Sequence, residues 1–183
     1  MPTVITHAVV PLALGWAMGR KAMPTGLLLA GAAAAMLPDA DVLAFRLGID
    51  YADQLGHRGA THSLMFAALI GLLGVWAARL FDVAPWRVAL WLAACTASHP
   101  LFDAMTNGGL GVAAFWPWSD ERLFAPWRPI LVSPIGLGFF GERGARVLAS
   151  EVQCLWLPTF AIAAWLGWQR IVRHTPPPRP TTS

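Results

Sequence analysis

Long apolar runs separated by shorter polar stretches define the predicted elements of this chain. Five runs have the length and composition of helices, and they cover residues 4–19, 25–37, 62–81, 86–106 and 152–172. A helix needs about 20 residues to cross the hydrocarbon layer of a membrane. The last three runs supply that length. The first two, and the second especially, are short, so we expect them to tilt or to pack against their neighbours without fully spanning.

The composition favours a membrane environment over a soluble core. Of 183 residues, 56% are hydrophobic and 13% are charged, whereas about a quarter of the residues in a soluble domain are charged. We therefore predict an all-α, polytopic membrane bundle of about five helices, formed by residues 1–173 as one domain. Residues 174–183 are rich in proline, which predicts a disordered tail.

The net charge of +3 does not indicate nucleic-acid binding, because the basic residues are scattered and form no stripe. Their distribution instead predicts an orientation, since short cytoplasmic loops are enriched in Lys and Arg. An outside N-terminus and an inside C-terminus put seven basic residues in short inner stretches: Arg20, Lys21, Arg79, Arg87, Arg170, Arg173 and Arg179. The longer outer stretches, 38–61 and 107–150, hold six. Cys95 and Cys154 are predicted to be free thiols.

The outer stretch 107–150 combines aromatic residues with Pro and Gly, and we predict that it lies on the membrane surface. Aromatic side chains favour the headgroup level of a bilayer, so the loop reads as an interfacial anchor, with substrate binding as the alternative. Its aromatic residues include Phe115, Trp116, Trp118, Phe124, Trp127, Phe139 and Phe140.

Histidines and carboxylates gather near the outer ends of the predicted helices. His99 and Asp103 are spaced i, i+4 on an apolar helix, so they share one face about 6 Å apart along the axis. This spacing suits two ligands of one ion, because ionisable residues in a membrane helix are costly and usually face a polar interior. The alternative is a His–Asp pair that only stabilises the fold.

Two further segments add candidates. Asp39 and Asp41 follow Pro38 and are separated by one residue. Either both are metal ligands, or one is a ligand, with Asp39 preferred, and the other caps the segment that follows. In the segment 56–64, His62 is placed as a ligand, while His57 and Arg58 on a Gly-flanked loop could contact an anionic substrate. The alternative for that segment is a basic interfacial loop in which Thr61 caps the following helix.

His7 and Glu151 complete the set of candidates. His7, near the start of the first helix, is a candidate because the other five candidate ligands are expected at the same end of the bundle. Glu151 is expected to begin the fifth helix, where an acid favourably meets the helix dipole, with a ligand role as the alternative. Nitrogen and oxygen ligands without thiolates suit zinc, manganese or iron. The candidate metal ligands are His7, Asp39, Asp41, His62, His99 and Asp103.

An ordered series of short motifs over residues 3–172 resembles the LexA-regulated, membrane-bound metal-dependent hydrolase family, also described as an uncharacterised inner-membrane domain. The series is T-H at residues 6–7, L-P-D-x-D at 37–41, H-R-G-x-T-H-S at 57–63 and H-x-x-x-D-x-x-T-x-x-G at 99–109. A segment ending at Arg122 resembles a degenerate form of the family's P-F-S-x-x-R motif. The order His, Asp, His, HxxxD is more distantly similar to zinc-dependent phospholipase C and the single-strand-specific zinc nucleases.

The resemblance implies an inner-membrane hydrolase that cleaves a phosphoester of a lipid or lipid-like substrate with one or two metal ions, most simply zinc. It implies that Asp103 is able to bridge two ions. We expect Arg58 or Arg122 to hold the anionic group, on the periplasmic side of the membrane. The alternatives are a non-enzymatic metal-binding or transport protein, and a structural protein whose polar cluster ties helices together.

Overall fold

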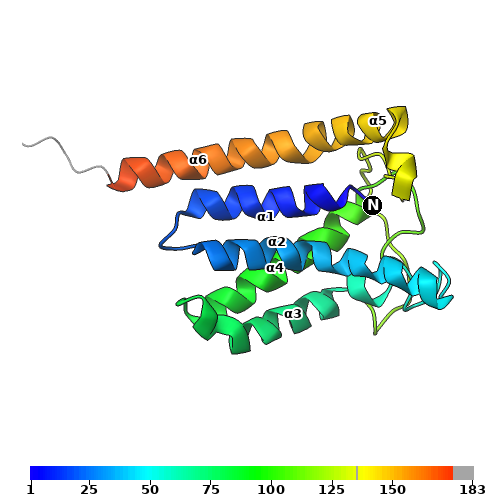
Figure 1. The fold of residues 1–183 in the computed structure, drawn as a ribbon, viewed down its shortest axis with the longest axis horizontal. Coiled ribbons are helices and arrows are strands. Elements are labelled where there is room, and N and C mark those ends of the chain that lie inside the picture. Colours follow the sequence, from blue (N-terminus) through cyan, green and yellow to red (C-terminus); the bar gives the residue numbers. More distant parts are fainter. Residues whose placement is uncertain (135, 175–183) are drawn as a thin grey trace, which may run out of the picture.

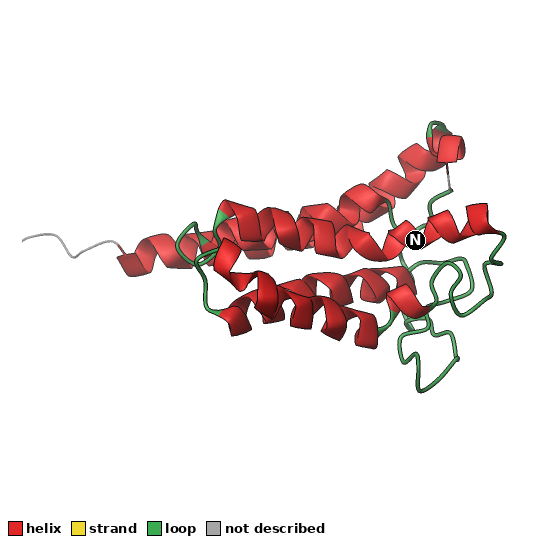
Figure 2. Ribbon diagram, turned by 60° about the horizontal axis from the view of Figure 1, so that its bottom comes forward, coloured by secondary structure: helices red, strands yellow, loops and turns green. Residues whose placement is uncertain are grey.

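The computed structural model describes residues 1–134 and 136–174, and in this part of the chain every regular element is helical. The helices lie roughly side by side along the longest axis of the molecule (Figures 1 and 2). Their bounds are Val4–Met18 for α1, Thr25–Met36 for α2, Leu64–Ala77 for α3, Pro85–Ala104 for α4, Glu142–Glu151 for α5 and Leu157–His174 for α6. Short 3₁₀ segments are Leu37–Leu47 (η1), Ala60–His62 (η2), Ala78–Leu80 (η3) and Gly136–Phe139 (η4).

Five helical rods result, as the sequence predicts, because η5, a π-helical turn at Val152–Trp156, joins α5 and α6 into one run. Two of the rods are long and apolar enough to cross a membrane, Thr25–Leu47 and Glu142–Arg173. Val4–Met18 is a shorter apolar helix, as expected, and so is Leu64–Leu80, for which the sequence predicted spanning length. The fourth rod was also expected to span, but it is not among the two that meet both the length and the hydropathy of a span. The second rod was expected to be the shortest. That expectation is wrong because η1 continues α2 by eleven residues, where the sequence suggested a loop.

The fifth rod also begins earlier than predicted, at Glu142 and not at residue 152. Its first ten residues form an amphipathic surface helix in which Val147 is buried, whereas Arg143 and Arg146 are exposed. A search for apolar runs overlooks such a helix, because charged residues interrupt the run. The fifth rod ends at His174, and the remainder of the predicted tail, residues 175–183, lies outside the described residues.

Close packing of small residues holds the rods together. The closest pairs are α3 with α4, α1 with α2, α2 with α4, and α1 with α6. Gly71 leaves no room for a side chain against Ala89 and Ala93, and Gly74 none against Leu92. Without a strong hydrophobic drive between helices in lipid, such close backbone approach is a main source of helix association. The core that results includes Leu27, Ala34, Ala35, Val88, Leu92 and Cys95.

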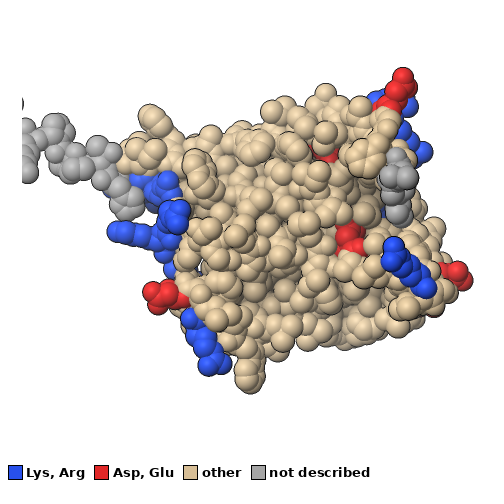
Figure 3. Space-filling model, in the orientation of Figure 1, with Lys and Arg blue, Asp and Glu red and all other residues tan. Residues whose placement is uncertain are grey.

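The two ends of the bundle differ in charge and in structure. A broad uncharged belt separates them in the space-filling view (Figure 3). One end holds the short connections α1–α2 and α3–α4, which are tied by the Arg87 guanidinium donating to the Ala22 carbonyl at 2.9 Å. Its basic residues are Arg20, Lys21, Arg79, Arg87, Arg170 and Arg173. The other end carries the long connections and the N-terminus (Figure 1).

The aromatic loop folds over this second end. Val112 and Leu123 pair through two backbone hydrogen bonds of 2.9 Å, and Ala113 N–H donates to the Arg58 carbonyl at 3.0 Å. Trp118 and Trp127 are 74% and 64% exposed, so their indole rings point away from the bundle. This exposure fits an anchor at the membrane surface, the first of the two roles that the sequence suggested. Cys95 and Cys154 are both free, Cys95 buried and Cys154 only partly so.

Candidate metal centre

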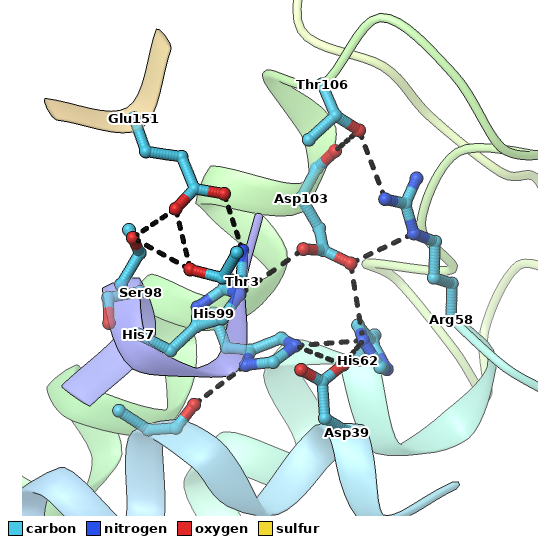
Figure 4. A network of polar contacts seen from close by, with 12 residues as sticks. Thr3, His7, Asp39, Arg58, His62, Ser98, His99, Asp103, Thr106 and Glu151 are labelled. Carbon is cyan, nitrogen blue, oxygen red and sulfur yellow. Dashed lines mark hydrogen bonds and ion pairs between the residues drawn. The ribbon is translucent and has the colours of Figure 1, made fainter. Parts of the chain in front are cut away.

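The predicted histidines and aspartates converge at the loop-rich end of the bundle, inside it (Figure 4). They come from α1, η1, the turn before η2, η2 itself and α4. His7, Arg58, His62, His99 and Asp103 are fully buried, and His57, Asp39 and Asp41 are no more than 9% exposed. So many buried ionisable groups are costly unless they pair or hold an ion.

The candidate ligands form two neighbouring groups. In the first, one ligand atom each from His7, His99 and Asp103 lies within 4.8 Å of the others. The His7 ring stacks on the His99 ring at 3.7 Å, and His7 Nε2 lies 3.5 Å from Asp103 Oδ1. The i, i+4 spacing therefore places His99 and Asp103 on one face, as predicted. His7 comes to that face from the first helix.

The second group consists of Asp39, His57 and His62, whose ligand atoms also lie within 4.8 Å of one another. His62 Nε2 lies 3.8 Å from Asp39 Oδ1 and 3.5 Å from Asp103 Oδ2. Asp39 Oδ1 in turn lies 3.3 Å from His99 Nε2. The two groups are thus one continuous cluster, with Asp103 facing a histidine of each.

Hydrogen bonds fix which nitrogen of each histidine points into the cluster. His99 Nδ1 lies 2.7 Å from the Ala35 carbonyl, which only accepts, so this nitrogen carries a proton. His62 Nδ1 lies 3.1 Å from Asp41 Oδ2 and so carries a proton likewise. In the neutral rings both Nε2 atoms are then lone-pair acceptors, yet they face each other at 3.0 Å. This arrangement is repulsive unless a cation, a proton or a metal ion, lies between them.

Other features of the cluster also call for positive charge. Both carboxylate oxygens of Asp39 are buried with no hydrogen-bond donor among the described residues. Burial lowers the pKa of His62, but its contacts with Asp103 and Asp41 outweigh burial and raise that pKa to about 9. The donor set of nitrogen and oxygen atoms fits zinc, manganese or iron.

Asp41 lies on the outer side of the histidines. Its Oδ1 is 2.6 Å from His57 Nδ1, and its Oδ2 accepts from the Arg58 backbone N–H at 3.1 Å. Thr61 donates to the same Oδ2 at 2.8 Å. A carboxylate on the Nδ1 side of two histidines is the usual way in which metal ligands are oriented.

The capping role considered for Thr61 is wrong. Its hydroxyl donates to Asp41, and the N-cap of α3 is Ser63, whose Oγ accepts from Phe66 N–H at 3.0 Å. A serine just before a long apolar run is a recognisable capping signal, so the sequence did carry this information.

Arg58 is buried inside the bundle, although its Gly-flanked sequence suggested a loop that contacts a substrate or lies at the membrane interface. Its Nε lies 2.9 Å from Asp103 Oδ2. Its terminal nitrogens donate to the Gly108 carbonyl at 3.0 Å and to Thr106 Oγ1 at 3.1 Å. The guanidinium therefore faces a candidate ligand, and its role toward a substrate stays a prediction.

Arg122 holds the backbone of the neighbouring segment. It donates to the carbonyls of His57 at 2.9 Å, Asp53 at 2.8 Å and Tyr51 at 3.2 Å. Burial lowers the pKa of Arg122 and raises that of Tyr51. The three contacts fix the turn that presents His57, and a direct contact between Arg122 and a substrate stays a prediction.

Glu151 has a different place from the one predicted. It ends α5, so a favourable contact with the N-terminus of its own helix is ruled out. Its buried carboxylate instead accepts 2.6 Å hydrogen bonds from Thr3 N–H, Thr3 Oγ1 and Thr6 Oγ1, at the N-terminus of α1. Glu151 thereby ties the fifth rod to the helix that carries His7. The sequence assigned no role to Thr3 or to Thr6 of the T-H motif, because nothing local marks their partner, which is 145 or more residues away.

The comparisons with known proteins agree with a membrane location. The family model described as YdjM inner membrane protein matches residues 1–175. The chain is 48% identical over 172 residues to the inner membrane protein YbcI of Escherichia coli strain K12, which covers 93% of this chain and 99% of that protein. No solved structure matches the chain. The match to the family model and the identity to a full-length relative show that this chain belongs to the YdjM inner membrane protein family.

Proposed function

We propose that this chain is a membrane-bound metal-dependent hydrolase that cleaves a phosphoester of a lipid or lipid-like substrate. The observation that carries the proposal is that two adjoining groups of buried His and Asp side chains each bring three ligand atoms within 4.8 Å of one another. The resemblance to the metal-dependent hydrolase family and to zinc-dependent phosphoesterases supports the choice of reaction.

The ligands of a first ion would be His7, His99 and Asp103, and those of a second Asp39, His57 and His62. His57, which the sequence suggested as a substrate contact, joins this second group by its position. A divalent ion supplies activated water and stabilises the charge that develops on a phosphoryl oxygen. Asp41 would hold His57 and His62 in the required orientation through their Nδ1 atoms. Arg58 would offset the charge of Asp103.

The test of this function has two steps. Protein purified in detergent should contain about one to two equivalents of zinc, manganese or iron. After the metal is removed with a chelator and restored, hydrolysis of a panel of phosphodiesters and phospholipids should depend on the added ion. Bound metal without hydrolysis of any substrate would favour the metal-binding or transport alternative. Protein that is free of metal after purification and cannot take it up would refute both the hydrolase proposal and the metal-binding alternative.

Orientation is a separate prediction. The end opposite the candidate metal centre carries short connections with six basic residues, so we expect it in the cytoplasm and the metal centre on the periplasmic side. In a background without Cys95 and Cys154, the exposed positions Leu55→Cys and Asp120→Cys should react with a membrane-impermeant maleimide from outside. Lys21→Cys and Arg173→Cys should react only in permeabilised cells. The reverse labelling pattern would show that the orientation is inverted.

A further inference from the structure

A groove runs along the outside of the bundle where α6 packs against α1, on the belt that faces lipid. It encloses about 540 Å³, and its lining has no charged side chain. Residues that shape it are Leu12, Ala13, Trp16, Leu28, Phe160 and Ala164. Its walls combine small residues with two exposed aromatic ones, Trp16, which is 72% exposed, and Phe160, which is 48% exposed.

A second hollow of about 270 Å³ continues the groove at the basic end of the bundle. Trp16 and Leu28 line both, so the apolar groove and this hollow are neighbours that share one wall. The second hollow is lined by two arginines, Arg20 after α1 and Arg170 on α6. The Arg170 side chain lies against Gly19, where any Cβ would collide with the guanidinium. Neither arginine forms an ion pair with an acidic side chain in the described part of the chain.

We propose that the groove and the hollow together bind one anionic phospholipid. An acyl chain fits the uncharged groove, and the phosphate of the same lipid then reaches Arg20 and Arg170, which have no acidic partner among the described residues. Basic pockets between membrane helices on the cytoplasmic side are a known way to hold anionic headgroups. The site lies at the opposite end from the candidate metal centre, so it is a binding site and does not depend on the proposed hydrolysis.

The test compares lipid retention in purified protein. The full chain is reconstituted in nanodiscs of phosphatidylglycerol and phosphatidylcholine, extracted in detergent, and its bound lipid is identified by native mass spectrometry. Phosphatidylglycerol should be retained in preference. The double variant Arg20→Gln/Arg170→Gln should lose that preference by about 30-fold, which corresponds to about 1 kcal/mol for each of the two arginines toward anionic lipid. Arg173→Gln, on the same helix end but outside the hollow, should keep it.

Two further measurements separate the apolar groove from a simple charge effect. Ala164→Trp should reduce retention of the lipid by filling the groove while leaving both arginines in place. Glycerol 3-phosphate, which has the headgroup chemistry without chains, should not displace the lipid. Equal retention of the two lipids by the parent, an unchanged preference in the double variant, or displacement by glycerol 3-phosphate would each overturn the proposal. Thermal unfolding verifies that each variant is folded.

Discussion

Asp103→Ala is expected to lose most of the bound metal and to destabilise the fold at the same time. Asp103 faces His7 and His62 at 3.5 Å, and its other fixed contact is Arg58 at 2.9 Å. Removing it takes a ligand from between the two groups and leaves a fully buried guanidinium without a counter-charge. Breaking one partner of a buried ion pair costs about 3–5 kcal/mol. Metal analysis and thermal unfolding in detergent measure the two effects separately.

The controls for this variant separate charge from shape. Asp103→Asn keeps the volume of the side chain but removes its charge, so it should lose metal with less disturbance of packing. Asp120→Asn makes the same chemical change at an exposed position of the same end, and it should change neither metal content nor stability. Parental metal content in Asp103→Asn would show that the charge of Asp103 is not needed to hold the ion.

Arg58→Ala is expected to have the opposite effect on metal. The substitution removes a buried positive charge beside Asp103, so a cation at the centre loses a repulsive neighbour. We expect the variant to keep its metal and the metal-free form to lose about 3–5 kcal/mol of stability, because Asp103 is then uncompensated. Added zinc should therefore raise the unfolding temperature of Arg58→Ala more than that of the parent. If Arg58 also contacts developing charge, hydrolysis should fall by about 10- to 1000-fold.

The double variant Arg58→Ala/Asp103→Ala tests whether these effects share one contact. The stability effects of substituting two residues in direct contact are not additive. The double variant should therefore be less destabilised than the sum of the two single variants. Arg46→Ala, an exposed arginine on η1, is the matched control and should leave metal and stability unchanged. Loss of metal in Arg58→Ala would show that Asp103 needs the guanidinium in order to bind. Parental hydrolysis in that variant would exclude Arg58 from catalysis and leave Arg122 as the next candidate.

The candidate centre was predictable from sequence because ionisable residues are rare on apolar helices. His99 and Asp103 stand out in an otherwise apolar run, and the alternation of the helices across the membrane then brings His7 and His62 to the same end. The clustering of these residues in the structure follows from that alternation. The number of helical rods was predictable for the same reason, since each apolar run is one rod.

Features that depend on distant partners were not predictable in this way. The segment around Arg58 reads as a substrate-binding or interfacial loop because glycines flank it, and the contacts of Arg58 with Asp103, Thr106 and Gly108 explain its burial. Glu151 meets threonines at the other end of the chain. The 3₁₀ segment η1 was expected to be a loop because Pro38 and two aspartates are typical of turns. Tertiary contacts decide each of these cases, and the local pattern does not contain them.

The change from α2 to η1 also determines the chemical form of His99. Ala35 lies in the last turn of α2, where the carbonyls run out of α-helical partners. His99 Nδ1 lies 2.7 Å from the Ala35 carbonyl. A carbonyl at the end of one helix thus fixes the tautomer of a histidine on another, and the nitrogen that remains available for an ion is chosen by the backbone before any ion arrives.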